Sequence, residues 1–205
     1  MKVQIDKTYP MPCSAEIAWQ FLQDIESVAS CMPGAKITER LDAGRHKGTV
    51  TAKVGPATMS FRGEVEMKDV DAGARTLRLI GKGTDTTGSS GASMDLTARI
   101  EASEGTRCNL VGAAEVSMSG KAVAFGGRMM NAVADQILKQ FADNFALKVG
   151  ALQAQRDATP PSGGAAPVAA APAAASAPPD SLNGIALMWA IVKDWLRGLF
   201  ANKSA

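Results

Sequence analysis

The chain has 205 residues, of which 46% are hydrophobic and 20% charged, proportions that are typical of a soluble globular protein and exclude bulk disorder. With 22 Lys and Arg against 20 Asp and Glu, the net charge is only +2, which argues against nucleic-acid binding through bulk charge. The amino-terminal stretch has no apolar core of signal-peptide length, and no apolar run is long enough to be an unambiguous membrane span. We therefore expect a cytoplasmic protein.

The start of the chain predicts one strand and one helix. Residues 2–9 alternate between apolar and polar side chains, as in a strand with one buried face. Ser14 is a natural cap for an amphipathic helix that we expect to run through Ile25. The Cys-Met-Pro-Gly-Ala segment at residues 31–35 should end this helix, because proline restricts the residue before it and glycine permits a turn.

A series of segments with period two follows, and it predicts an antiparallel sheet with one apolar face. Short turn-forming connectors separate these segments, as in successive hairpins. The glycine-rich stretch Gly81–Ser93 is expected to be a turn between strands, because no helix follows it as a phosphate loop requires. The segments are residues 49–54, 59–68, 77–79, 94–100 and 108–118.

After Gly120 the period changes to that of a helix. Apolar residues recur at spacings of three and four up to about Val149, which predicts a long amphipathic helix. Its apolar stripe must cover the apolar face of the sheet. The pattern as a whole predicts an α+β fold.

The predicted inner face is unusual in its side chains. Methionine outnumbers phenylalanine by ten to six in this chain, and small residues stand among the inward methionines. Methionine adapts to a guest, and small residues leave space, so this face predicts an apolar ligand cavity. An ordinary filled core would give the same periodicity and remains the alternative. The predicted cavity residues are Met59, Phe61, Val65, Met67, Leu79, Met94, Leu96, Ala98, Leu110, Ala114, Val116, Met130, Val133, Ile137 and Phe141.

Groups suited to catalysis or metal binding are scarce. The three cysteines, Cys13, Cys31 and Cys108, are too scattered for a zinc site or a disulfide framework and are expected to be buried thiols. The single histidine, His46, lies between two basic residues and is expected in a solvated hairpin turn. Glu64 has the outward parity of a solvated side chain, as does Glu66 two positions on. We predict no catalytic residue, no metal and no covalent cofactor.

The composition changes abruptly near residue 157. Residues 157–180 are rich in Ala and Pro and predict a disordered linker between a folded domain, residues 1–156, and a tail, residues 181–205. The tail predicts an amphipathic helix that lies on a membrane surface; docking in a partner's groove or on the folded domain are the alternatives. Its predicted membrane-contacting residues are Leu182, Ile185, Met188, Trp189, Val192, Trp195, Leu196, Leu199 and Phe200.

Several segments resemble the family of the carbon monoxide dehydrogenase G subunit. They are Cys31–Ala35, Lys53–Pro56 and Phe61–Gly63, with Ala124–Arg128 and Gln140–Phe145 at the long helix. The resemblance covers about residues 1–150 and implies a helix-grip fold of the START type, in which a curved antiparallel sheet wraps around a long carboxy-terminal helix. By this resemblance, six residues of the chain match signature positions of the family that have no known catalytic role. They are Cys31, Pro33, Gly34, Lys53, Gly55 and Pro56.

The resemblance also implies a function. Members of this family are associated with recruiting a molybdenum-containing carbon monoxide dehydrogenase to the cytoplasmic membrane and with carrying respiratory quinone. We therefore expect an accessory protein, not an enzyme, on the cytoplasmic side of the membrane, with that dehydrogenase, the membrane surface and quinone as partners. A pure membrane anchor without a cavity and a cyclase- or hydrolase-like helix-grip enzyme are the alternatives.

Overall fold

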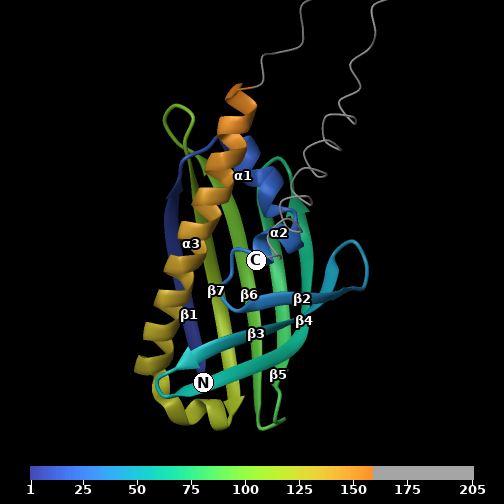
Figure 1. Cartoon of the computed structure of the whole chain (residues 1–205), viewed down its shortest axis with the longest axis vertical. Coiled ribbons are helices and arrows are strands. Elements are labelled where there is room, and N and C mark those ends of the chain that lie inside the picture. Colours follow the sequence, from blue (N-terminus) through green and yellow to red (C-terminus); the bar gives the residue numbers. More distant parts are fainter. Residues whose placement is uncertain (159–205) are drawn as a thin grey trace, which may run out of the picture. The chain divides into compact units, whose positions relative to one another are not determined.

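The computed structural model describes residues 1–158. The predicted tail helix lies outside this part of the chain, and so does the predicted linker apart from residues 157 and 158, which are helical. Seven antiparallel strands form one sheet in the order β1-β7-β6-β5-β4-β3-β2, and the sheet curves around the last helix (Figure 1). The strands are β1 (Lys2–Met11), β2 (Ala35–Arg40), β3 (Arg45–Val54), β4 (Ala57–Asp71), β5 (Thr76–Asp85), β6 (Ser90–Ala102) and β7 (Cys108–Gly120).

The helices come from the two ends of the described chain. Two short helices follow β1, and the long helix follows β7 after one 3-10 segment. The α+β class and the curved sheet around a long carboxy-terminal helix are confirmed. The helices are α1 (Ala15–Leu22), α2 (Ile25–Ala29), η1 (Lys121–Phe125) and α3 (Gly126–Ala158).

The first helical region differs from its prediction in one respect. Ser14 caps α1 as expected, and its hydroxyl accepts a hydrogen bond from the backbone N–H of Ile17. The helix does not continue through Ile25, because the Asp24 carboxylate accepts from the N–H groups of Glu26 and Ser27 and so begins a second helix.

The edge strand β2 was not predicted from the sequence. Only Ile37 and Ala35 of its six residues are half-buried on the inner face, so the segment shows little alternation. The strand is held by pairing with β3, which is a tertiary contact.

The prediction for His46 is wrong. The residue lies in β3, where it pairs with Val65 of β4, and it is only 3% exposed. The turn lies a few residues earlier, around Asp42, whose carboxylate accepts from the N–H groups of Gly44 and Arg45. The basic neighbours of His46 point to the opposite face, as alternation in a strand requires.

Gly34 occupies a position that only glycine tolerates. Its φ is +74°, and a Cβ at this residue would lie 2.1 Å from the carbonyl oxygen of Thr51. The carbonyl of Gly34 also accepts a hydrogen bond from the Thr51 N–H at 2.9 Å. The approach of the two backbones therefore joins the loop after α2 to the middle of β3.

We predict that Gly34→Ala lowers the free energy of unfolding by about 3–5 kcal/mol, because it combines a left-handed backbone with a main-chain collision. Gly88→Ala is the matched control, since Gly88 has a φ of +73° but no atom within 4 Å of the added Cβ. The control should cost only about 1–2 kcal/mol. Urea unfolding of both variants measures the difference, and equal losses would contradict the collision.

Candidate functional site

The inner face of the sheet is the face that α3 covers. Strand register places Val65 opposite Gly81, Leu79 opposite Leu96, and Leu96 opposite Ala114, so these side chains share one face. Every strand residue of the predicted cavity has this parity. The sequence therefore predicted the correct face.

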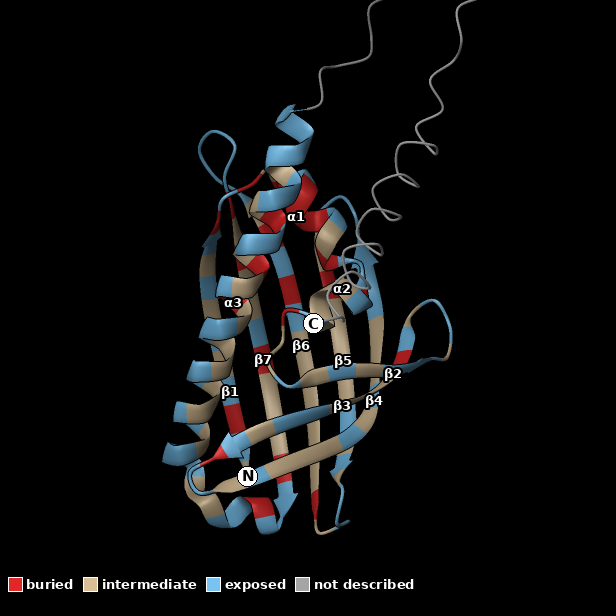
Figure 2. Ribbon diagram, viewed as in Figure 1, coloured by how far each residue is buried: buried red, intermediate tan, exposed pale blue. Residues whose placement is uncertain are grey.

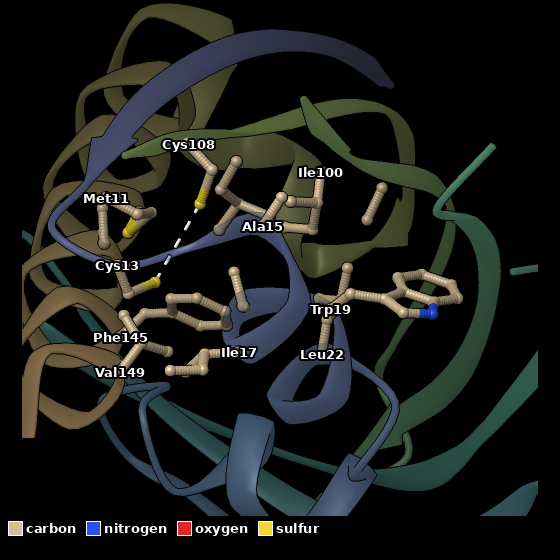
Figure 3. Packing of buried hydrophobic residues seen from close by; sticks show 14 of the residues in the cluster. Met11, Cys13, Ala15, Ile17, Trp19, Leu22, Ile100, Cys108, Phe145 and Val149 are labelled. Carbon is tan, nitrogen blue, oxygen red and sulfur yellow. Dashed lines mark hydrogen bonds between the residues drawn. The ribbon is translucent and has the colours of Figure 1, made fainter. Parts of the chain in front are cut away.

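One half of the space between α3 and the sheet is filled. Phe145 of α3 is fully buried, and its ring meets Phe21 of α1 edge-on with centroids 4.9 Å apart. Helix α1 adds further side chains, so this end forms a continuous core (Figure 3). We call it the packed zone; Ala98 and Leu110 of the predicted cavity belong to it. Ala114 of the predicted cavity is also buried, although it lies outside this cluster.

The other half of this space is less well covered. Its side chains have the inner parity or lie on the apolar stripe of α3, yet each is only half-buried and lies outside the packed cluster. In Figure 2 much of the middle and lower sheet is intermediate in burial, although single residues there, such as Val54 and Met118, are buried. We call this set the open zone: Met59, Phe61, Val65, Met94, Leu96, Val116, Met130, Val133 and Ile137.

Burial along α3 has the same division. The buried residues Ala142, Phe145 and Val149 lie in its carboxy-terminal half, whereas Met130, Val133 and Ile137 earlier in the helix are half-buried. Met67, Leu79 and Phe141 pack against the edge of the buried cluster and mark the border between the two zones.

His46 contributes a polar atom on the inner face. Its Nδ1 is buried and has no hydrogen-bond partner within residues 1–158, and its Nε2 lies 3.8 Å from Oε1 of Glu26 in α2. A buried nitrogen without a partner costs roughly 1–3 kcal/mol unless a water or a ligand supplies one. Extending the alternation of Val50, Ala52 and Val54 back by two steps would have placed His46 on this face.

Two other ionisable side chains with inner parity already have partners. Lys7 of β1 forms an ion pair with Asp135 of α3 at 2.9 Å, and this contact raises the pKa of Lys7. The Asp85 carboxylate accepts from Thr87 Oγ1, Ser89 Oγ and the Ser90 N–H at the end of β5, which lowers its pKa.

The three cysteines are buried, as predicted. Cys13 Sγ and Cys108 Sγ lie 4.0 Å apart and share a hydrogen bond in the packed zone (Figure 3). This bond and burial raise the pKa of Cys108, so its thiol stays protonated at neutral pH. Burial likewise raises the pKa of Cys31. The Cys108 thiol on the inner face is therefore not activated as a nucleophile.

The signature segments join distant parts of the chain to α3. Asn144 of α3 donates through Nδ2 to the carbonyl of Cys31 at 2.9 Å, which connects the first segment to the helix. Gly55 has a φ of +59°, and a Cβ at this residue would lie 3.5 Å from Met129 Sδ. The β3–β4 hairpin therefore contacts the start of α3, while Lys53 and Pro56 of the same hairpin stay exposed.

A shallow depression of about 600 Å³ lies over β4–β7. Most of its side chains have the outward parity of Arg62 and Lys82, and small residues at neighbouring positions leave the surface hollow. The depression is therefore separate from the predicted cavity. Its lining is Arg62, Gly63, Glu64, Lys82, Gly83, Thr84, Gly91, Ala92, Ser93, Ser117, Met118 and Ser119.

Within residues 1–158 no three His, Cys, Asp or Glu side chains are placed to hold a metal ion. No helix in the same part of the chain is long and apolar enough to cross a membrane.

Residues 11–150 match the family model described as the G subunit of carbon monoxide dehydrogenase (CoxG). The chain belongs to this family. No curated protein matches the chain. The match includes the signature segments and both zones, so the family resemblance expected from the sequence is confirmed.

Solved structures confirm the helix-grip fold of this CoxG family member. A conserved protein from Geobacillus kaustophilus superposes with a TM-score of 0.66 at 16% identity, over 73% of this chain and 96% of its own. A START superfamily protein from Mycobacterium smegmatis superposes with a TM-score of 0.53 at 15% identity, over 73% of this chain and 98% of its own. The Zhui aromatase/cyclase from a Streptomyces species superposes with a TM-score of 0.54 at 15% identity, over 73% of this chain and 94% of its own. At such identities the likeness concerns the fold alone.

We predict that Phe145→Ala lowers the free energy of unfolding by about 3–5 kcal/mol, because it opens a void in the packed zone. Phe61→Ala, in the open zone, should cost only about 1 kcal/mol, because its ring is already partly exposed. Denaturant unfolding of both variants tests the division. Equal losses would mean that the two zones are packed alike.

Proposed function

We propose that this CoxG family member is a non-catalytic accessory protein that binds respiratory quinone in the open zone. It recruits a carbon monoxide dehydrogenase-type molybdenum hydroxylase to the cytoplasmic membrane and so couples carbon monoxide oxidation to respiration. The single observation that carries the quinone proposal is the half-exposed apolar surface between α3 and the sheet.

The chemistry of the open zone suits a prenylated ring. All nine of its side chains are apolar, and three of them are methionines, whose flexible thioethers adapt to different shapes. Covering about 200 Å² of an isoprenoid tail would contribute roughly 5 kcal/mol. Because the bilayer also solvates the tail, uptake requires a surface as apolar as this one.

His46 offers a polar contact for the ring. It is paired with Val65 of the open zone, and its Nδ1 has no partner within the described chain. A quinone carbonyl accepts a hydrogen bond and a quinol hydroxyl donates one, so the quinone–quinol pair can satisfy either tautomer of the imidazole. We propose that the ring lies toward His46.

The recruitment proposal has different support. The family name links these proteins to carbon monoxide dehydrogenase. The sequence of residues 181–205 predicts an amphipathic helix suited to a membrane interface. Together they favour an adaptor that holds the dehydrogenase near its quinone pool.

We predict that the purified full chain takes up ubiquinone or menaquinone from phosphatidylcholine vesicles, as measured by extraction of the re-isolated protein. Met94→Trp should reduce uptake at least about tenfold, because the larger ring fills the open zone. Ser93→Trp is the matched control, since the neighbouring position points to the outer face. His46→Leu should weaken uptake without lowering stability.

Two results would contradict the quinone proposal. One is a wild-type chain that acquires no quinone from vesicles. The other is a Met94→Trp variant that folds and acquires as much quinone as Ser93→Trp. Either result would favour an anchor with a filled core.

We predict that deletion of residues 181–205 releases both this protein and the dehydrogenase from membranes, because the predicted amphipathic helix is removed. Membrane fractionation of cells that express the shortened chain measures the loss. Quinone binding by the same chain is the internal control and should persist. A dehydrogenase that stays on the membrane would contradict recruitment through the tail.

A further inference from the structure

One end of the described domain is formed by three segments that are distant in sequence. They are the β3–β4 hairpin at Lys53–Ala57, the 3-10 helix η1, and the first turn of α3 at Gly126–Met130 (Figure 1). A Cβ at Gly55 would lie 3.5 Å from Met129 Sδ, so the hairpin lies beside the first turn of α3. The N–H of Lys121 donates to the Ser89 carbonyl at 3.1 Å, which joins η1 to the β5–β6 turn. We call this surface the basic end.

The basic end carries an excess of positive charge, with the Asp85 carboxylate of the adjoining β5–β6 turn as its acidic neighbour. Lys53, Lys121 and Arg128 are exposed, and none of them forms an ion pair with a carboxylate within residues 1–158. The chain has no Asp or Glu between residues 48 and 63, or between residues 116 and 134. By contrast, Lys7 and Lys139 farther along the same side are paired with Asp135 and Asp143.

Exposed apolar side chains stand among these cations. Val123 is 39% exposed and Met129 is 40% exposed, and Phe125 between them is partly exposed. Ala122 fixes η1 in place, because its N–H donates to the buried Ser90 hydroxyl at 3.0 Å. The apolar side chains are therefore held outward by an ordered segment.

We propose that the basic end docks on the surface of an anionic phospholipid bilayer, independently of residues 181–205. Unpaired cations beside exposed apolar side chains match a negatively charged headgroup layer above an acyl region. The open zone begins at this end, since Met59 follows the hairpin and Met130 closes the first turn of α3. Docking there would bring the open zone to the lipid. The choice of a membrane as the partner rests on the proposed function.

Hydrogen–deuterium exchange of the full chain tests this inference without quinone. Vesicles of equal parts phosphatidylglycerol and phosphatidylcholine should slow exchange in residues 53–57 and 121–130, whereas vesicles of phosphatidylcholine alone should not. The β4–β5 turn at residues 72–75, which follows the exposed Val70 at the end of β4, is the internal control and should be unaffected.

The triple variant Lys53→Glu/Lys121→Glu/Arg128→Glu should raise the lipid concentration for half-maximal protection about 100-fold. A second triple variant is the matched control. It makes the same change of net charge at three exposed cations outside the basic end and should behave as the wild type. The control substitutions are Arg62→Glu, Lys82→Glu and Arg107→Glu.

The inference is overturned if anionic vesicles bind the chain without protecting the basic end, or if both triple variants lose protection equally. It is also overturned if purified dehydrogenase protects this end and vesicles do not, because the partner is then an acidic protein surface. Protection at this end in a chain that takes up no quinone would support docking while contradicting the proposed ligand, so the two failures are distinguishable.

Discussion

The organisation of this domain depends on the mismatch between one helix and seven strands. A helix is about 10 Å across and neighbouring strands are about 4.8 Å apart, so a flat seven-stranded sheet would extend roughly 29 Å and leave most of its apolar face uncovered. The sheet therefore curls around α3. Gly63 permits this curvature, because a Cβ there would lie 2.0 Å from the Lys82 carbonyl oxygen. Helix α1 fills one end only, which leaves the open zone beside the other half of α3.

Much of this arrangement could be predicted from local patterns. Alternation identified every strand except β2, together with the correct inner face, and the change of period after Gly120 identified α3. The failures have a common cause. His46 resembles a turn residue because its neighbours are basic, yet pairing with Val65 and the presence of α2 bury it. Likewise, periodicity shows that Phe61 and Leu110 face inward, but only the position of α1 determines that Leu110 is buried and Phe61 is half-exposed.

The family signature gains a physical meaning from these contacts. Gly34 permits the close approach to Thr51, and the carbonyl of Cys31 in the same segment accepts from Asn144 of α3. The second segment meets α3 at its other end, through Gly55. These positions therefore determine how the outer strands attach to the helix. Such a role explains why glycine occurs there without any catalytic group.

The two attachments differ in how readily they separate. At Asn144 the contact is a hydrogen bond between a side-chain amide and the main chain. Separating the two surfaces would leave both polar groups without a partner, which is costly. At Gly55 the helix presents only a thioether, and each atom pair there contributes roughly 0.1–0.2 kcal/mol of dispersion. Rotation about the three side-chain torsions of Met129 can relax this contact while every strand keeps its register. The curved sheet can therefore separate from α3 more readily at the rim near Gly55 than at the rim held by Asn144.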